Sequence, residues 1–201
     1  MKKLFAIFAV GAAMFSLATV ASATVLTFDD ITSDDWDAPV PSGYGGLPLE
    51  WSNIGVVVEG YSGGYYGKSA VSGDYAAYNG DGEEASTASL SSGTFNFYGA
   101  YFTTAAKSAG VDGDIEVRGY LDGTQVGTTT TIELVSLADP LWVDFDLAGI
   151  DELVFTPLRT GHGAYFAMDN FTGSVVPEPI SFVIWSLLTV VGMTFAGWRR
   201  R

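Results

Sequence analysis

Aromatic side chains suited to sugar binding are concentrated in one glycine-rich stretch of the chain. Residues 43–82 hold 11 of the 25 glycines, together with Tyr44, Trp51, Tyr61, Tyr65 and Tyr66. The flat faces of such rings stack on the apolar C–H faces of sugars, so the pattern predicts a glycan-stacking platform. The same composition is also typical of a long irregular connection whose tyrosines cover a sheet edge, and the sequence leaves both interpretations open.

Residues that could catalyse a reaction are sparse. His162 is the only histidine, and no serine lies in a Gly-x-Ser-x-Gly pattern. The absence of cysteine excludes thiolate nucleophiles, thiolate zinc sites and disulfides. We therefore predict a protein that is not an enzyme. The alternative is a glycan-cleaving enzyme that uses two of the 23 carboxylates as a pair.

Charge is distributed unevenly along the chain. The formal net charge is −14, but residues 24–176 hold 22 acids and only four bases, which gives this segment a net charge of −18. The remaining five bases lie at the two apolar ends. A segment so acidic is repelled by phosphate backbones, which excludes nucleic acid as a partner.

The N-terminus has the pattern of a secretory signal peptide. Two lysines follow Met1, an apolar run extends from residue 4 to 20, and Ala21 and Ala23 form a small-x-small cleavage pattern. We therefore expect residues 1–23 to be removed by cleavage before Thr24. An N-terminal membrane anchor that stays in place is the alternative.

The C-terminus has the pattern of a membrane-spanning helix. Residues 180–197 carry no charge, and they are followed by Trp198, Arg199, Arg200 and Arg201. As a helix this stretch spans about 27 Å, close to the thickness of a bilayer core. The positive-inside rule places the arginines in the cytoplasm, so we expect a precursor in the inner membrane with its acidic domain in the periplasm.

The residues that precede this helix carry a resemblance. Pro177, Glu178 and Pro179, with the adjacent apolar helix and the three terminal arginines, resemble the PEP-CTERM sorting signal of Gram-negative bacteria. The resemblance implies recognition by an exosortase, removal of the last ~25 residues, and release or transfer of the protein to the cell surface or extracellular space. It also implies a link to exopolysaccharide and biofilm. An ordinary C-terminal anchor is the alternative.

The middle of the chain has short β-type runs and almost no helical periodicity. Nine runs are rich in Val, Ile, Thr, Phe and Tyr and are bounded by turn-forming residues. An Asp-Gly pair at Asp122 and Gly123 predicts a tight hairpin turn. The nine predicted strands are Val25–Phe28, Gly55–Gly60, Tyr75–Tyr78, Thr94–Thr103, Asp114–Leu121, Thr128–Val135, Leu141–Asp146, Leu153–Thr156 and Ala164–Thr172.

Short motifs in this middle segment carry a second resemblance. Residues 28–31 (Phe-Asp-Asp-Ile), 43–47 before Trp51, and 166–171 resemble secreted galactose-binding-like jelly rolls, the architecture of many carbohydrate-binding modules. In such domains the first and last strands are adjacent and often hold a structural calcium ion. The resemblance therefore implies a Ca²⁺ site whose ligands are Asp29, Asp30, Asp169 and Asn170. The same residues are also ordinary turn formers.

These patterns together predict an all-β protein of three segments. Residues 1–23 are a signal-peptide helix, residues 24–175 an antiparallel jelly-roll β-sandwich of about nine strands, and residues 176–201 the sorting signal with its transmembrane helix. The predicted function is that of a non-enzymatic, exported protein of the extracellular matrix that binds exopolysaccharide or adheres within a biofilm. A matrix protein without a specific ligand is a further alternative.

Overall fold

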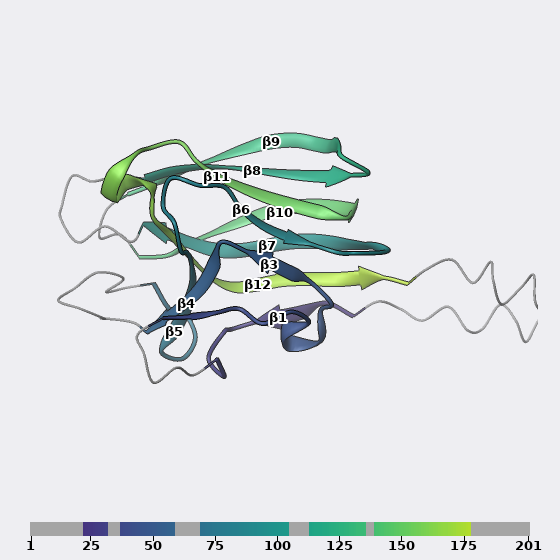
Figure 1. Ribbon diagram of the computed structural model, residues 1–201, viewed down its shortest axis with the longest axis horizontal. Coiled ribbons are helices and arrows are strands. Elements are labelled where there is room, and N and C mark those ends of the chain that lie inside the picture. The colour runs from purple at the N-terminus through teal and green to yellow at the C-terminus, as the bar shows by residue number, and fades with distance from the viewer. Residues whose placement is uncertain (1–21, 32–36, 59–68, 105–112, 136–138, 178–201) are drawn as a thin grey trace, which may run out of the picture.

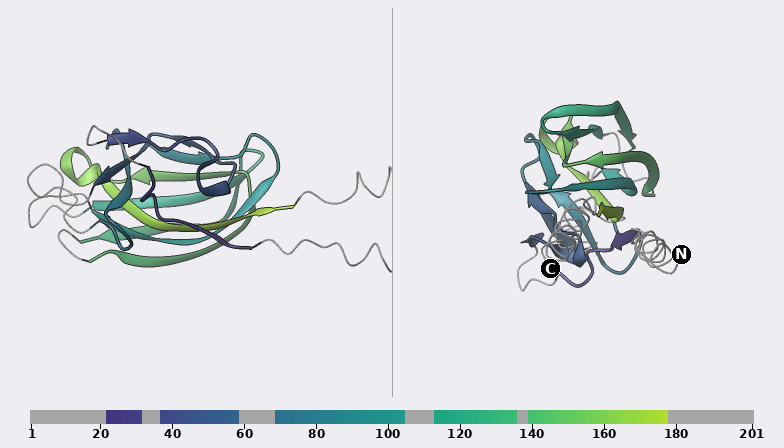
Figure 2. Two further views of the ribbon diagram at one scale, coloured as in Figure 1. Left: turned by 90° about the horizontal axis from the view of Figure 1, so that it is seen from below. Right: turned by 90° about the vertical axis from the view of Figure 1, so that its right-hand side faces the viewer.

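The protein is an antiparallel β-sandwich over the residues that the computed structural model describes, which are 22–31, 37–58, 69–104, 113–135 and 139–177. These ranges contain twelve strands and two short 3₁₀ helices, η2 (Tyr44–Gly46) and η3 (Gly161–Ala164). Figure 1 looks through both layers with strand β9 along the top, and Figure 2 shows the molecule from two further sides. No helix within these ranges is long and apolar enough to cross a membrane.

The twelve strands form two sheets, and most connections pass from one sheet to the other. Sheet A has seven strands in the order β10-β7-β12-β5-β4-β2, with β1 also paired to β12. Sheet B has five, in the order β3-β6-β11-β8-β9. In chain order the strands are β1 (Thr24–Leu26), β2 (Asp37–Pro39), β3 (Glu50–Ser52), β4 (Ile54–Val58), β5 (Tyr75–Asn79), β6 (Ser86–Ser89), β7 (Thr94–Thr104), β8 (Gly113–Leu121), β9 (Thr124–Leu134), β10 (Leu141–Ile150), β11 (Glu152–Pro157) and β12 (Phe166–Val176).

Strand β12 is the centre of sheet A. On one side it pairs with β7 along its whole length, from Phe166 opposite Thr104 to Val176 opposite Thr94. On the other side it pairs first with β5 and then with β1. Because β1 is antiparallel to β12, the chain enters the domain beside the point at which it leaves (Figure 1).

Phenylalanine rings from both sheets form the core. Phe97 of β7 stacks on Phe171 of β12 with ring centroids 4.6 Å apart. Phe102 of β7 contacts Phe155 of β11 across the two layers at 6.1 Å. All four rings are fully buried. Burial of such large apolar rings supplies the main stabilisation of a sandwich that has no disulfide.

The predicted strands agree with the observed ones, but the predicted number is too small. Each of the nine predicted runs falls on a strand, whereas β2, β3 and β6 were not predicted. These three strands have three or four residues each, too few for an alternating pattern to be detectable. The two predicted flanking helices, at 1–23 and 180–197, lie outside the described residues apart from residues 22 and 23.

The predicted hairpin turn is confirmed. Asp122 and Gly123 both have positive φ angles, 50° and 72°, and connect β8 to β9 with Leu121 opposite Thr124. The backbone N–H of Asp122 also donates a hydrogen bond of 2.8 Å to a carboxylate oxygen of Asp151. A two-residue turn of this conformation matches the right-handed twist of the strands that it joins.

We predict that Phe97→Ala destabilises the protein by about 3–5 kcal/mol, because it removes a fully buried ring and leaves a cavity beside Phe171. Urea unfolding measures the loss, and Leu158→Ala is the control. Leu158 is 46% exposed, so its truncation is expected to change stability by no more than about 0.5 kcal/mol. Equal losses in the two variants would show that the Phe97 ring is not a core contact.

Candidate functional site

Two aromatic rings lie side by side on the outer face of sheet A. Trp142 of edge strand β10 is directly opposite Tyr101 of β7, and their ring centroids are 5.1 Å apart in an edge-to-face arrangement. The rings face away from sheet B, because the neighbours of Tyr101 in sequence, Ala100 and Phe102, are buried in the core. Both rings are half-buried, so part of each is open to solvent.

A glycine makes room for the tryptophan. A Cβ atom added at Gly99 of β7 would lie 2.6 Å from a carbon of the Trp142 ring, which is closer than carbon atoms approach. The indole therefore occupies space that a side chain at position 99 would fill. Its edge-to-face contact with Tyr101 depends on this space.

Polar groups border the two rings. The indole Nε1–H of Trp142 donates a 2.7 Å hydrogen bond to Oδ1 of Asp144, which is exposed on the same strand. Tyr98 also points outward, and its hydroxyl lies 2.9 Å from the hydroxyl of Ser174. We call Tyr98, Tyr101, Trp142 and Asp144 the aromatic face. It presents ring surface together with a carboxylate and a hydroxyl group.

The rest of the outer surface of sheet A differs from the aromatic face. Side chains of β4, β5 and β12 form a second small apolar cluster, and all of them are buried: Val57, Ala76, Tyr78 and Ala167. Tyr78, the aromatic side chain of this cluster, is thus buried, whereas Tyr101 and Trp142 on the β7 and β10 side are only half-buried.

Next to Tyr101, a buried carboxylate of β12 holds a loop in place. Asp169 lies opposite Tyr101 and is fully buried. Its Oδ2 accepts hydrogen bonds from the backbone N–H groups of Val71 at 2.7 Å and Ser72 at 2.9 Å. Burial raises the pKa of Asp169, and the nearby charge of Asp29 adds to this, while the backbone N–H donors lower it; the net direction is upward.

Asp29, which follows β1 near the start of the domain sequence, binds the same loop. Its Oδ1 accepts hydrogen bonds from the backbone N–H groups of Asp74 at 3.0 Å and Tyr75 at 3.2 Å. Gly73 is positioned between these contacts with a φ of 58°, and a Cβ atom there would collide with the Asp29 carboxylate. The loop is thus fixed from both sides by carboxylates of the first and last parts of the chain.

The structure brings together three of the four predicted calcium ligands. Asp29, Asp169 and Asn170 all lie around the 71–75 loop, and the Asn170 side-chain oxygen accepts a hydrogen bond from the Ser72 hydroxyl. Asp30 accepts a hydrogen bond from the Tyr44 hydroxyl instead. Burial raises the pKa of Tyr44, and the Asp30 carboxylate raises it further.

These oxygens do not fit a calcium cage as they stand. The carboxylates of Asp29 and Asp169 point at N–H donors, whereas a cation needs oxygens that turn toward a common centre. Within the described ranges, no group of three or more His, Cys, Asp or Glu side chains is arranged to hold a metal ion. Calcium binding by Asp29, Asp30, Asp169 and Asn170 stays a prediction.

Two of the five stacking residues predicted from the sequence, Tyr44 and Trp51, are described by the structure, and neither belongs to the aromatic face. Trp51 packs edge-to-face against Phe171 at 5.3 Å, and Tyr44 stacks on Phe28 at 5.6 Å, so both rings contact the core. Tyr61, Tyr65 and Tyr66 lie outside the described residues, and so do Glu178, Pro179 and the three terminal arginines of the sorting motif. Ala23 and Pro177 lie at the two ends of the described domain, and Ala21 lies outside it.

The aromatic face itself was not predicted. Tyr98 and Tyr101 lie within the predicted strand Thr94–Thr103, and Trp142 is the second residue of the predicted strand Leu141–Asp146, about 40 residues further along the chain. Alternation alone places Trp142 on the face opposite Val143. Only the register, Trp142 opposite Tyr101, shows that the rings meet.

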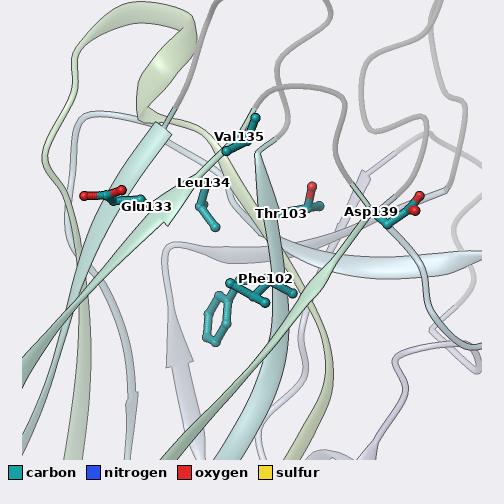
Figure 3. Close-up of a pocket in the computed structure, with 7 residues that line it drawn as sticks. Phe102, Thr103, Glu133, Leu134, Val135 and Asp139 are labelled. Carbon is teal, nitrogen blue, oxygen red and sulfur yellow. The ribbon is translucent and has the colours of Figure 1, made fainter.

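A cavity of about 210 Å³ opens between β7, β9 and the start of β10. Its walls are mainly apolar, with Phe102, Leu134 and Leu141 among them, and Glu133 and Asp139 lie at its rim. Figure 3 shows the Glu133 carboxylate pointing away from Leu134 and Phe102, with Asp139 on the opposite side. The two carboxylates do not converge on one point, as the paired acids of a glycosidase do.

The sequence matches no protein-family model and no curated protein. Among solved structures, the CBM22-1 xylan-binding domain of Paenibacillus barcinonensis Xyn10C has 13% identity and a TM-score of 0.42, over 81% of this chain and 98% of that one. CBM51 from Clostridium perfringens GH95, in complex with methyl-galactose, has 13% identity and a TM-score of 0.38, over 75% and 99%.

An apo form of a cyclase from Fischerella sp. has 16% identity and a TM-score of 0.38, over 79% of this chain and 98% of that one. The identities and TM-scores to this chain are thus similar for a xylan-binding domain, a module in complex with methyl-galactose and a cyclase. At this level the likenesses carry no argument about a ligand or an activity of this chain.

We predict that Gly73→Ala destabilises the protein by at least about 1 kcal/mol more than Gly93→Ala does, since overpacking typically costs about 1–3 kcal/mol. Both glycines have positive φ, 58° and 79°, so both variants share the backbone penalty. Gly93 has no atom within 4 Å of an added Cβ, whereas Gly73 has the Asp29 carboxylate. Thermal unfolding measures both, and equal losses would show that the contact of Asp29 with the loop does not stabilise the protein.

Proposed function

We propose that this protein is a non-catalytic carbohydrate-binding domain and that the aromatic face of sheet A is its binding surface. The observation that carries the proposal is the cross-strand pair of Tyr101 and Trp142, two half-exposed rings on adjacent strands with centroids 5.1 Å apart. A sugar ring in a chair conformation is apolar on its C–H faces and polar around its edge. The pair offers ring surface for the first, and Asp144 and Tyr98 offer polar groups for the second.

The rigidity of the aromatic face supports this function. Trp142 is held by the hydrogen bond from its indole N–H to Asp144, and the residues on either side of Tyr101 are buried in the core. A ligand that stacks on rings already held in place avoids the entropic cost of ordering them. An open sheet surface, unlike a closed pocket, also admits the middle of a long polymer.

We predict that Trp142→Ala and Tyr101→Ala each weaken binding to the polysaccharide of the host by about tenfold or more, since aromatic anchors of an interface commonly contribute well over 1 kcal/mol. Co-sedimentation with the purified polymer measures the affinity. Tyr120→Ala is the matched control, because Tyr120 is half-buried on β8 in the other sheet.

Unchanged retention of both variants would contradict the proposed function. The same experiment tests the alternative of a glycan-cleaving enzyme, because the polymer recovered from the assay is examined for new reducing ends. Retention without shortening of the polymer supports binding alone, whereas shortening would support hydrolysis.

We further propose that the domain is exported and sorted by an exosortase through Pro177, Glu178 and Pro179. The position of the motif supports this. Val176 is the last residue of β12 and Pro177 follows it directly, so the motif begins where the sheet ends. Removal of the residues after the motif would leave every strand pair of β12 intact.

We predict that the mature protein from a host with an exosortase lacks residues 1–23 and the last ~25 residues, including Arg201, because both flanking segments serve only in export and sorting. Intact-mass analysis of the exported protein measures this. A host without the exosortase is the control and is expected to retain the C-terminal segment. Detection of Arg201 in the protein from the exosortase-positive host would contradict sorting.

A further inference from the structure

Among the described residues, the charged side chains of the two strands that carry the aromatic face, β7 and β10, are all acidic. Asp144 and Asp146 are exposed on β10, the edge strand that carries Trp142. The two basic residues in the described part of the chain, Arg118 and Arg159, both form ion pairs with acids of β8 in the opposite sheet. A ligand on the aromatic face therefore meets negative charge without a compensating cation among the described residues.

The position of Asp144 makes this charge relevant to a stacked sugar. One carboxylate oxygen accepts the indole N–H of Trp142 at 2.7 Å, which holds the carboxylate at the rim of the ring. A carboxylate has about four acceptor sites and no donor, so most of its capacity is left for a ligand. Groups at the edge of a sugar stacked on Trp142 must therefore be hydrogen-bond donors. Hydroxyls meet this requirement, and ammonium groups meet it with an added charge interaction.

A sugar acid would be disfavoured at the same position. Its carboxylate has no proton to donate to Asp144 and carries the same charge. The free energy of a single exposed ion pair is small. The charge of Asp144 therefore changes which glycans are preferred more than it changes how tightly glycans bind. Stacking on Trp142 and Tyr101 supplies affinity for neutral sugars, amino sugars and sugar acids alike.

We propose that the aromatic face selects glycans by charge, favouring polymers of amino sugars with free amines over neutral polymers and rejecting polyuronates. This inference rests on the proposed function, because it names the ligand class of the same site. Asp144 is the residue that determines the selection. Trp142 and Tyr101 bind the sugar ring without regard to its charge.

The test compares three β-1,4-linked oligomers of equal length, made of glucosamine, glucose or glucuronate, by calorimetry at mildly acidic pH. We expect the glucosamine oligomer to bind about two- to fivefold more tightly than the glucose oligomer, the range of one exposed charge pair. The glucuronate oligomer is expected to bind most weakly. Added salt should reduce the advantage of the amine and leave binding of the glucose oligomer unchanged.

Two charge variants separate selection at the site from general attraction to an acidic protein. Asp144→Asn keeps an acceptor for the indole N–H of Trp142 but removes the charge, so the affinities for the glucosamine and glucose oligomers should become equal. Glu152→Gln removes the same charge from β11 of sheet B and should leave the preference intact. A preference that survives Asp144→Asn, or tighter binding of the glucuronate oligomer, would overturn the inference.

Failure of the inference is distinct from failure of the proposed function. Equal binding of all three oligomers, lost in Trp142→Ala, would refute charge selection and leave carbohydrate binding in place. Binding that Trp142→Ala does not change would refute both. No binding of any oligomer would refute the inference alone, and retention on the polymer of the host that is lost in Trp142→Ala would still support the proposed function.

Discussion

The pairing of β12 with neighbours on both sides is the constraint on which the rest of the domain depends. Its backbone is hydrogen-bonded to β7 along its full length and to β5 and β1 on the other side. Its inward side chains, Phe166 and Phe171 among them, contact the rings of β7 and β11. Through this one strand, segments that are more than 140 residues apart in the sequence, β1 and β12, become adjacent. A strand paired on both sides has no free edge, and its position is therefore determined more strictly than that of any edge strand.

Alternation of side chains along β7 and β12 places core residues on one face of sheet A and the residues of the aromatic face on the other. Successive side chains of a strand point to opposite faces, so the same segment of β7 sends Phe102 into the core and Tyr101 to the outside. The buried rings fix the register, and the register in turn determines which outer side chains meet. Tyr101 thereby receives Trp142 on one side and Asp169 on the other. The aromatic face is a consequence of core packing, because a slip of one residue would separate its rings.

The sequence reveals nine of the twelve strands because each carries a run of β-forming residues bounded by turn formers, and in Thr94–Thr103 the run also alternates. It does not reveal β2, β3 and β6, which form only because longer strands lie beside them. Asp29 and Asp169, two of the expected calcium ligands, both contact the 71–75 loop, where their carboxylates accept hydrogen bonds from backbone N–H groups. The aromatic face could not be predicted, because a pairing between residues about 40 positions apart depends on the register of two bulged strands. Trp51 was predicted to stack on a glycan because it lies in a glycine-rich stretch. In the structure its ring contacts Phe28 and Phe171.

The position of β12 also determines how the domain would carry mechanical load. When the chain is held at its C-terminal end and a polymer pulls on the aromatic face, tension runs along β12 and into β7. The force is then parallel to the strands, and all the hydrogen bonds between them must break together instead of one after another. A strand in this geometry resists extension far better than a hairpin that is pulled open from one end. The same residues that hold the fold together at rest would thus make the domain a strong link between a surface and a polymer under flow.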